Sequence, residues 1–336
     1  MKLLAIDTSC DESCASIIDT DKWRLLADVV HTHVDLMQKY GGIVPEVASR
    51  EHLRGVPLAV GEALGRAGLR CQDLDWIAVT NRPGLIGALL VGVSYAKALA
   101  FALGKPFSVH NHIDGHLFSP LLGTLDGKTA PPYPWIALVV SGGHTEIFKV
   151  TGPLEFQWLG GTLDDAAGEA FDKVGKILGL AYPAGPLIDK GVKGFTDAQR
   201  ARFKFPRAKM EGLEFSFSGL KTAVALQVKK LGDLADEERW AVAAAAQEAI
   251  VDVLVDKIRL AQKLFDIPQV VVTGGVACNS RLRDRLPGAY FPSPRHCSDN
   301  SAMIALLAAL QAKAGTLKTA SWSTTAHAGV DFTAKI

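Results

Sequence analysis

The sequence predicts an α/β protein that contains a repeated strand–turn–strand unit. The segment LLAIDTSCDESCASIID, residues 3–19, has an apolar run, a turn rich in Thr, Ser and acidic residues, and a second apolar run. This is the pattern of two strands joined by a turn. The segment WIALVVSGGHTEIFKV, residues 135–150, repeats the plan with a glycine-containing turn. Helical patterns alternate with further strand patterns, which favours an internally duplicated fold of three layers, with helices covering sheets.

The remaining elements follow the same alternating plan. Apolar runs at residues 76–80 and 107–110 predict strands, and VVVTGGVACNSRLR at 270–283 predicts a strand that passes through two glycines into a helix. Such a turn can place a ligand against a helix N-terminus. Segments rich in Pro and Gly at 120–134 and 181–194 are expected to be connections or lids. Helical periodicity predicts helices at residues 85–103, 165–178, 240–265 and 300–314.

Length and composition bound the class of protein. A chain of 336 residues exceeds what a single compact core usually holds, so two domains or one duplicated domain are expected. A hydrophobic fraction of 48% with 21% charged residues is typical of an ordinary soluble globular protein. The net charge of +1 neither requires nor excludes a nucleic-acid partner, because a balanced total can hide a local patch.

One such patch is the basic stretch, defined as Lys190–Lys209. It holds one acidic residue, Asp197, and three phenylalanines among its Lys and Arg residues. Two interpretations stay open: an ordinary solvated face, or a surface for a polyanion such as RNA. The basic residues are Lys190, Lys193, Arg200, Arg202, Lys204, Arg207 and Lys209.

Cysteine usage and the N-terminal segment indicate a cytoplasmic protein. The five cysteines form an odd set without a CxxC pair, which favours free thiols in a reducing compartment over a disulfide framework. The start MKLLAIDTSCDE reaches an acid at Asp7, which leaves no room for the apolar core of a signal peptide. We expect no stretch with the uncharged length that a membrane span needs.

The segment HIDGH, residues 112–116, is a candidate metal site. Two histidines four positions apart share one face of a helix and can both bind one metal ion. A protease of the H-E-x-x-H type is disfavoured, because Ile113 stands where the glutamate that activates zinc-bound water is required. His112 and His116 therefore predict either another metal site, with a third ligand from elsewhere, or a partly exposed histidine pair at a helix start.

Asp299, in CSDNSAMIA, is a candidate for the third ligand. It lies just before an apolar helical pattern, where an Asp commonly serves as the N-cap. The cap is the favoured interpretation from sequence alone, although one carboxylate can fill both roles.

Two glycine turns are candidates for binding phosphate or nucleoside groups. SGGHT at 141–145 either presents backbone N–H groups to a phosphate or forms a tight hairpin with glycines at positive φ. TGGVACN at 273–279 ends in Asn279, whose amide can hydrogen-bond a base or a ribose. Asp172 precedes Lys176 by four positions, and such a pair usually forms on a helix surface. Ligand binding at Asp172 is the alternative.

These segments, taken in order and spacing, resemble the TsaD family of universal tRNA threonylcarbamoyladenosine transferases. The resemblance covers residues 3 to about 312. It rests on ordered blocks, which makes it far more specific than a single glycine loop. The blocks are IDTSCDES (6–13), GGIVPEVASREH (41–52), PGLIGALLVG (83–92), HIDGH, VVSGGHT, DDAAGEAFDKVGKILGL (164–180), FSFSGLKT (215–222), TGGVACNSRLR and CSDNSAMIA.

The resemblance implies a fold and an activity. The fold would be an actin-like ASKHA fold of two duplicated α/β lobes with a ligand cleft between them. The N-terminal lobe is expected to span 1–110 and 310–336, and the C-terminal lobe 111–309. Members transfer a threonylcarbamoyl group from threonylcarbamoyl-AMP to N6 of adenosine 37 in tRNAs that read codons beginning with A, and AMP is released.

The resemblance also implies roles for particular residues. The metal ligands fall on His112, His116 and Asp299, with iron the expected metal and zinc or manganese as alternatives. Asp11 or Glu12 is hypothesised to position or deprotonate the adenine amine. The substrate-binding positions fall on Val139, Val140, Ser141, Gly142, Gly143, Asp172, Gly185, Asp189 and Asn279.

The implied partners are tRNA, threonylcarbamoyl-AMP and a protein complex with TsaB and TsaE, without a membrane. A sugar or acyl-phosphate kinase of the same fold is the alternative enzyme, but such a kinase has no special use for the histidine pair. A nucleotide-gated scaffold is the non-enzymatic alternative, and metal-dependent group transfer would exclude it.

Overall fold

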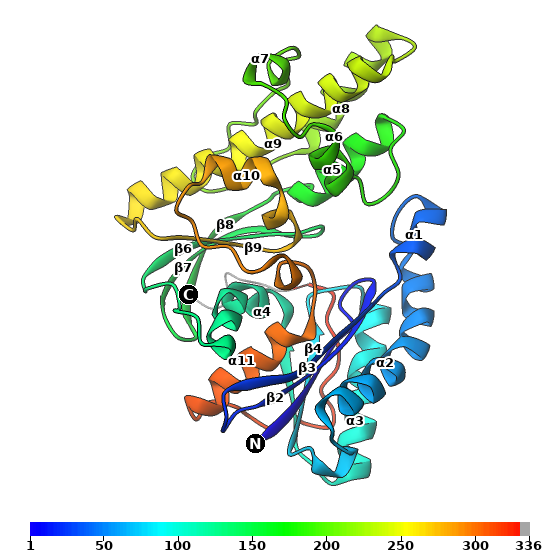
Figure 1. Cartoon of the computed structure of the whole chain (residues 1–336), viewed down its shortest axis with the longest axis vertical. Helices are drawn as coiled ribbons and strands as arrows, with labels where there is room; N and C mark the ends of the chain where they lie inside the picture. Colours follow the sequence, from blue (N-terminus) through cyan, green and yellow to red (C-terminus); the bar gives the residue numbers. More distant parts are fainter. Residues whose placement is uncertain (330–336) are drawn as a thin grey trace. The chain divides into compact units, whose positions relative to one another are not determined.

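The computed structural model describes residues 1–329, and the chain divides into two compact units (Figure 1). The first unit comprises Met1–Ala130 and the chain from Pro292 onward, and the second comprises Pro131–Phe291. These bounds differ from those expected for the lobes, because residues 111–130 and 292–309 pack with the first unit. Each unit contains helices and one sheet, so the predicted α/β class is confirmed.

The sheet of the first unit has the order β3-β2-β1-β4-β5. Strand β1 is central, pairing antiparallel with β2 and parallel with β4. Parallel pairing continues from β4 to β5, so β1, β4 and β5 all end at the same edge of the sheet. The strands are β1 (Lys2–Asp7), β2 (Glu12–Asp19), β3 (Arg24–Thr32), β4 (Trp76–Arg82) and β5 (Phe107–Asn111).

Helices lie on both faces of this sheet (Figure 1). Leu4 and Ile6 of β1 belong to an apolar cluster with α2 (Pro45–Ala67) and α3 (Ile86–Leu103). Helix α11 (Ser301–Lys313) packs on β1 and β2 from the other side. The unit also contains α1 (Val34–Tyr40), α4 (His112–Phe118) and the 3₁₀ segments η1 (Cys71–Asp73), η2 (Ser119–Asp126) and η4 (Pro294–His296).

Helix α3 is long and apolar enough to cross a membrane by length and composition. The helix carries Lys97, so it is not an uncharged stretch of the kind that the sequence was expected to lack. One such helix is weak evidence for a span, because the core helix of a soluble protein passes the same test. Leu89, Val93 and Ala96 of α3 pack in the core beside the sheet, and Lys97 donates from its side chain to the carbonyl of Thr324 (2.9 Å).

The sheet of the second unit has the order β8-β7-β6-β9, which repeats the arrangement of β3-β2-β1-β4. Three consecutive strands form an antiparallel meander, and a later strand joins the first of them in parallel. The predicted duplication is thus present in the strand topology. The strands are β6 (Trp135–Val140), β7 (Thr145–Gly152), β8 (Glu155–Gly161) and β9 (Val270–Thr273).

The sequence patterns did not predict every helix of the second unit. The segment 181–194, expected to be a connection or lid, contains α6 (Ala184–Gly191), and α8 (Ser218–Leu231) follows a long loop. Helix α9 (Asp236–Phe265) begins earlier than predicted. Acidic residues in its first turn stabilise this start, because they interact favourably with the positive end of the helix dipole. The others are α5 (Ala167–Ile177), α7 (Asp197–Arg200), η3 (Gly275–Cys278) and α10 (Ser280–Arg285).

Candidate metal centre and ligand-binding loops

Helix α4 presents the two histidines of HIDGH. The helix starts directly after β5, and the side chain of Asn111 caps it by accepting hydrogen bonds from the backbone N–H groups of Ile113 and Asp114. His112 and His116 lie one turn apart and are 3% and 0% exposed. The alternative of a partly exposed surface pair is therefore wrong.

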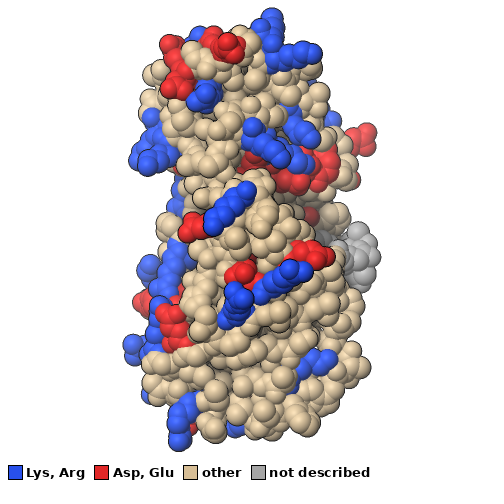
Figure 2. Space-filling view, turned by 90° about the vertical axis from the view of Figure 1, so that its right-hand side faces the viewer, with Lys and Arg blue, Asp and Glu red and all other residues tan. Residues whose placement is uncertain are grey.

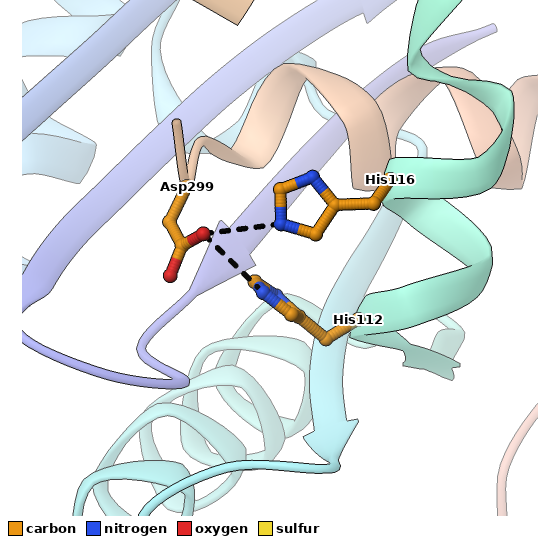
Figure 3. Close-up of side chains that lie close together, drawn as sticks. All are labelled: His112, His116 and Asp299. Atoms are coloured by element: carbon orange, nitrogen blue, oxygen red, sulfur yellow. Dashed lines mark hydrogen bonds and ion pairs between the residues drawn. The ribbon is translucent and has the colours of Figure 1, made fainter. Parts of the chain in front are cut away.

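Asp299 lies next to this pair because α11 approaches α4 closely. A Cβ on Gly115 would lie 2.8 Å from Ile304 Cδ1, so the glycine between the histidines permits the close helix contact. The N-cap of α11 is Asn300, whose side chain accepts from the backbone N–H of Met303 (3.0 Å). The cap role favoured for Asp299 from sequence is wrong, and its carboxylate faces the histidines instead (Figure 3).

Three ligand atoms converge in this centre. Asp299 Oδ1 lies 3.1 Å from His116 Nε2 and 3.5 Å from His112 Nε2 (Figure 3). One donor atom from each of the three residues lies within 4.8 Å of the other two. Two imidazoles and one carboxylate form a donor set suited to a divalent transition metal and leave further coordination positions open to a substrate.

Asp7 is hydrogen-bonded to the candidate metal ligand His112, and the sequence patterns did not single it out. His112 Nδ1 donates to Asp7 Oδ2 (2.9 Å), while Ser9 and Thr80 donate from their hydroxyls to the same carboxylate (2.7 Å each). A carboxylate behind a ligating histidine fixes the ring so that its other nitrogen faces the metal. The signal that could have found Asp7 is its place at the end of β1, the edge where β5 leads into His112.

The charges in the centre favour a cation between the two carboxylates. Burial disfavours a charged His112, but Asp7 and Asp299 outweigh burial and raise the pKa of His112 to about 10. Burial lowers the pKa of His116. Burial alone would raise the pKa of Asp299. The attraction of His112 and His116 outweighs burial and holds this pKa well below its usual range. The residues therefore fit a resident divalent cation.

Of the hypothesised base residues, Asp11 lies in the turn between β1 and β2, and Glu12 is the first residue of β2. Buried His52 donates from Nε2 to the carbonyl of Cys10 (3.0 Å) and accepts from the hydroxyl of Ser13 at Nδ1 (2.7 Å). These bonds fasten the turn to α2. Burial and the nearby Asp299 raise the pKa of Glu12 well above its usual value. Both candidate acids thus lie at a fixed junction of turn and strand, in the unit that holds the candidate metal ligands.

The turn between β6 and β7 has a different construction. The backbone N–H of Ser141 donates to the carbonyl of His144 (2.8 Å), and that of Gly168 in α5 donates to the carbonyl of Ser141 (3.2 Å). Neither Gly142 nor Gly143 has φ in the left-handed region, and a Cβ on either would meet no atom within 4 Å. The segment therefore forms the tight hairpin of the alternative interpretation, but without the positive φ expected for its glycines.

The remaining substrate positions also lie in the second unit. Val139 and Val140 are buried at the end of β6. Gly185 is in the first turn of α6, and Asp172 Oδ1 accepts from the backbone N–H of Ala184 (2.7 Å) in the same turn.

Asp189, also in α6, is hydrogen-bonded to the start of α10. Its carboxylate accepts from the backbone N–H (3.1 Å) and hydroxyl (2.8 Å) of Ser280. Asn279 directly precedes Ser280 and caps α10 by accepting from the backbone N–H of Leu282 (3.0 Å). Two predicted substrate positions therefore meet at one helix start.

The basic stretch is only partly a basic surface. Arg200 is 8% exposed, while Arg202 and Arg207 pair with Glu237 and Asp252. The interpretation of Arg200 as surface charge is wrong. On the face shown in Figure 2, Lys and Arg side chains lie interspersed with Asp and Glu side chains. The exposed lysines of the stretch are Lys190, Lys193, Lys204 and Lys209.

One family model and its named relatives match this chain over most of its length. The family model for TsaD, tRNA N6-adenosine threonylcarbamoyltransferase, matches residues 24–306. A protein of that name from Anaeromyxobacter sp. (strain Fw109-5) is 47% identical over 317 residues, which cover 91% of this chain and 93% of the relative. Another, from Sorangium cellulosum (strain So ce56), is 47% identical over 332 residues, covering 94% and 93%.

Solved structures support the fold. HypF from T. kodakarensis aligns with a TM-score of 0.59 at 15% identity, covering 95% of this chain and 48% of HypF. Full-length HypF in a phosphate- and nucleotide-bound form aligns with a TM-score of 0.57 at 14% identity, covering 96% and 47%. Similarity at these identities shows the fold alone. Together with the family match, it confirms the predicted ASKHA-type α/β fold.

Proposed function

Because the chain belongs to the TsaD family of tRNA N6-adenosine threonylcarbamoyltransferases, we propose that it transfers a threonylcarbamoyl group to N6 of an adenosine in tRNA. The proposed donor is threonylcarbamoyl-AMP, the acceptor is adenosine 37 of tRNAs that read codons beginning with A, and AMP is released. The observation that carries the proposal is the convergence of His112, His116 and Asp299 in a chain with this family match.

We propose that these three residues hold one divalent metal ion, iron in the first instance and zinc or manganese as alternatives. When bound, such an ion supplies Lewis-acid stabilisation of negative charge on a leaving phosphate oxygen. Asp7 orients His112, and the cap at Asn111 fixes the helix start that carries it. The ligands therefore need no rearrangement before binding, which lowers the cost of assembling the site.

The proposed donor is a mixed anhydride and is already activated, so the residues need to orient reactants rather than form a covalent intermediate. We propose that Asp11 or Glu12 accepts the proton from the adenine amine as the new bond forms. Alanine replacement of each residue in turn tests this role. Full transfer activity in both variants would remove the proposal for this pair while leaving the metal ligands untouched.

In the second unit, the proposed nucleotide contacts are Val139–Gly143 with Asp172, Gly185, Asp189 and Asn279. The turn offers backbone groups to an approaching ligand, since Gly142 and Gly143 carry no side chain and the space beside their Cα atoms is open. The carboxylate of Asp189 and the amide of Asn279 are suited to the hydroxyls of a ribose and the polar edge of a base.

We propose that exposed lysines of the basic stretch contribute to tRNA binding in the cytoplasm, and that TsaB and TsaE are partner proteins. Each lysine that contacts a phosphate adds to the salt dependence of binding. The triple variant Lys193→Ala, Lys204→Ala, Lys209→Ala is expected to weaken tRNA binding and flatten its dependence on salt. Unchanged affinity and salt slope would make the stretch an ordinary solvated surface.

The kinase of the same fold is not favoured. The curated relatives named above are threonylcarbamoyltransferases, and a kinase has no specific need for an imidazole pair beside a carboxylate. The two reactions also differ in products, because phosphoryl transfer from ATP leaves ADP, whereas transfer from threonylcarbamoyl-AMP leaves AMP.

The test supplies purified protein, threonylcarbamoyl-AMP, unmodified tRNA and the partner proteins, and detects the modified nucleoside by mass spectrometry. The proposal predicts threonylcarbamoyladenosine with the parent chain, strong loss with His112→Ala, and normal yield with His327→Ala, which alters an exposed histidine of the same unit. No modified nucleoside with the parent chain would contradict the transferase function. Full yield with His112→Ala would contradict the role of the metal centre.

A further inference from the structure

Gln247 is a buried polar residue on α9 that the reaction described above does not use. Its side chain is 1% exposed among alanines and aliphatic residues of the same helix. A buried amide is costly unless it is hydrogen-bonded. Both ends of this amide are used: Nε2 donates to Asp189 Oδ1 (2.9 Å), and Oε1 accepts from Arg200 Nη1 (2.8 Å). Gln247 thus connects a buried arginine to a proposed substrate contact.

Arg200 determines which way round the amide lies. A guanidinium only donates hydrogen bonds, so the oxygen of Gln247 must face Arg200 and the NH₂ group must face Asp189. Arg200 is itself fixed by donating to the carbonyls of Val192 (3.1 Å) and Phe195 (3.3 Å). Rotation of the amide by half a turn would bring its oxygen against the Asp189 carboxylate, which is repulsive.

Asp189 is held from two directions. Three of its hydrogen bonds, from Gln247 and from the N–H and hydroxyl of Ser280, end on Oδ1, and the Ser280 N–H also lies 3.1 Å from Oδ2. An ionised carboxylate has about four acceptor sites on its two oxygens. With Oδ1 occupied in this way, Oδ2 keeps acceptor capacity for a hydroxyl donor.

We propose that Gln247, oriented by Arg200, is a positioning residue that holds the Asp189 carboxylate to accept a hydrogen bond from a ribose hydroxyl of the bound adenosine nucleotide. The inference rests on the proposed function, which places Asp189 against the ribose. By this proposal the buried Arg200 contributes to nucleotide recognition, although the sequence alone placed it in a basic surface.

The test measures recognition of the ribose hydroxyls, which a purely structural role would not alter selectively. The probes are AMP and 2′,3′-dideoxy-AMP, titrated calorimetrically into the full chain. Gln247→Met keeps a side chain of similar length without the hydrogen bonds, and Gln247→Glu places a second carboxylate against Asp189. Gln262→Met is the matched control on the same helix, where the amide donates to the carbonyl of Pro268 (2.7 Å).

The parent chain is expected to bind AMP roughly tenfold more tightly than the dideoxy analogue, the usual effect of one hydrogen bond to a charged group. Both Gln247 variants should lose this preference with unchanged affinity for the analogue, as should Asp189→Ala, whereas Gln262→Met should keep it. Thermal unfolding confirms that each variant is folded.

The failures of the two proposals are distinguishable. If the parent chain shows no preference for AMP, or Asp189→Ala retains it, the ribose contact itself is wrong and the inference falls with it. If Asp189→Ala loses the preference but both Gln247 variants retain it, only the positioning role is overturned. Equally weaker binding of AMP and of the dideoxy analogue in the Gln247 variants would also overturn the positioning role, because that result indicates general damage to the fold.

Discussion

The turns β1–β2 and β6–β7 occupy equivalent places in two sheets of the same topology, yet they are built differently. At the first turn, Asp7 at the end of β1 and Ser9 are buried and hydrogen-bonded to His112, so the polar groups there belong to side chains. In the second turn, Gly142 and Gly143 leave the backbone accessible beside the N-terminus of α5. A repeated strand framework can therefore carry a side-chain site in one unit and a backbone site in the other.

The difference extends to the buried acids beside each turn. Burial raises the pKa of Asp7, but its partner His112 outweighs burial and lowers it overall. Glu146, at the start of β7, accepts a hydrogen bond from the indole N–H of Trp158 (2.7 Å), and burial outweighs that bond and raises its pKa to about 7. A cationic partner thus keeps the first acid charged, whereas a neutral donor does not suffice for the second.

The largest effect is expected from removing a proposed metal ligand in the first unit. Asp299→Ala should eliminate stoichiometric metal and lower transferase activity on the order of a thousandfold, since a bound ion supplies several kcal/mol of charge stabilisation. Metal content by plasma mass spectrometry and the rate of nucleoside formation measure the two effects. Normal metal content in this variant would show that the side-chain site is not a metal site.

Glu146 should make the stability of the second unit depend on pH. Its pKa is raised in the fold, so its contribution to stability is fully present below about pH 4.5 and is lost as pH rises through about 7. The maximum loss is on the order of 3 kcal/mol. Glu146→Gln should flatten the stability curve over this range, and Glu155→Gln, at an exposed position of the same hairpin, should not. Denaturant unfolding at several pH values measures the slopes, and parallel curves for parent and Glu146→Gln would refute the assignment.

Asp7→Asn tests whether Asp7 strengthens metal binding at the candidate metal centre. Loss of a carboxylate behind a ligating histidine typically lowers metal affinity by about 10–100-fold. The matched control is Asp21→Asn at the other end of the same hairpin, where the side chain is 81% exposed and pairs with the N-terminus. Competition with a metal-binding dye measures both affinities. Equal metal affinities of the two variants would show that Asp7 does not support metal binding.

The smallest effect on stability is expected at the second turn. Gly143→Ala introduces a Cβ into open space at an ordinary φ, so the free energy of unfolding should change by less than about 1 kcal/mol. AMP affinity should nevertheless fall, because the methyl group occupies the space that the ligand needs. Calorimetric titration and thermal unfolding check the two expectations together.

Gly274→Ala provides the contrast to Gly143→Ala. Gly274 has φ of 93°, and a Cβ there would lie 2.3 Å from the carbonyl oxygen of Val140. We expect this variant to lose about 2 kcal/mol or more of stability. If Gly143→Ala were equally destabilising, the glycines of the second turn would serve the fold rather than a ligand.

Local sequence patterns predicted the elements that form one clear apolar run. The strands at 76–80 and 107–110 are short runs that are buried on both faces, and the helix at 85–103 is an apolar run too long for a strand. Helix α2 was missed, since Pro57 lies inside it and reads as a breaker. The segment 181–194 was misread for the same reason, because Gly185 and Pro186 look like helix breakers but lie in the first turn of α6.

The site was predictable where the ligands share a motif and not where tertiary contacts decide the role. The spacing of His112 and His116 is visible in the sequence. That Asn300 caps α11, and that the close approach of α4 at Gly115 brings Asp299 to the histidines, is visible only in the folded structure. Arg200 looked like surface charge because burial of an arginine depends on a partner far away in sequence, here Gln247. Composition alone carries no such information.

The most direct test of the central claim is a crystal structure of the protein purified with its metal, with anomalous diffraction recorded at the absorption edges of iron, zinc and manganese. We expect one strong anomalous peak within about 2.0–2.3 Å of His112 Nε2, His116 Nε2 and a carboxylate oxygen of Asp299. A protein that is active in transfer but shows no anomalous peak among these three side chains would contradict it.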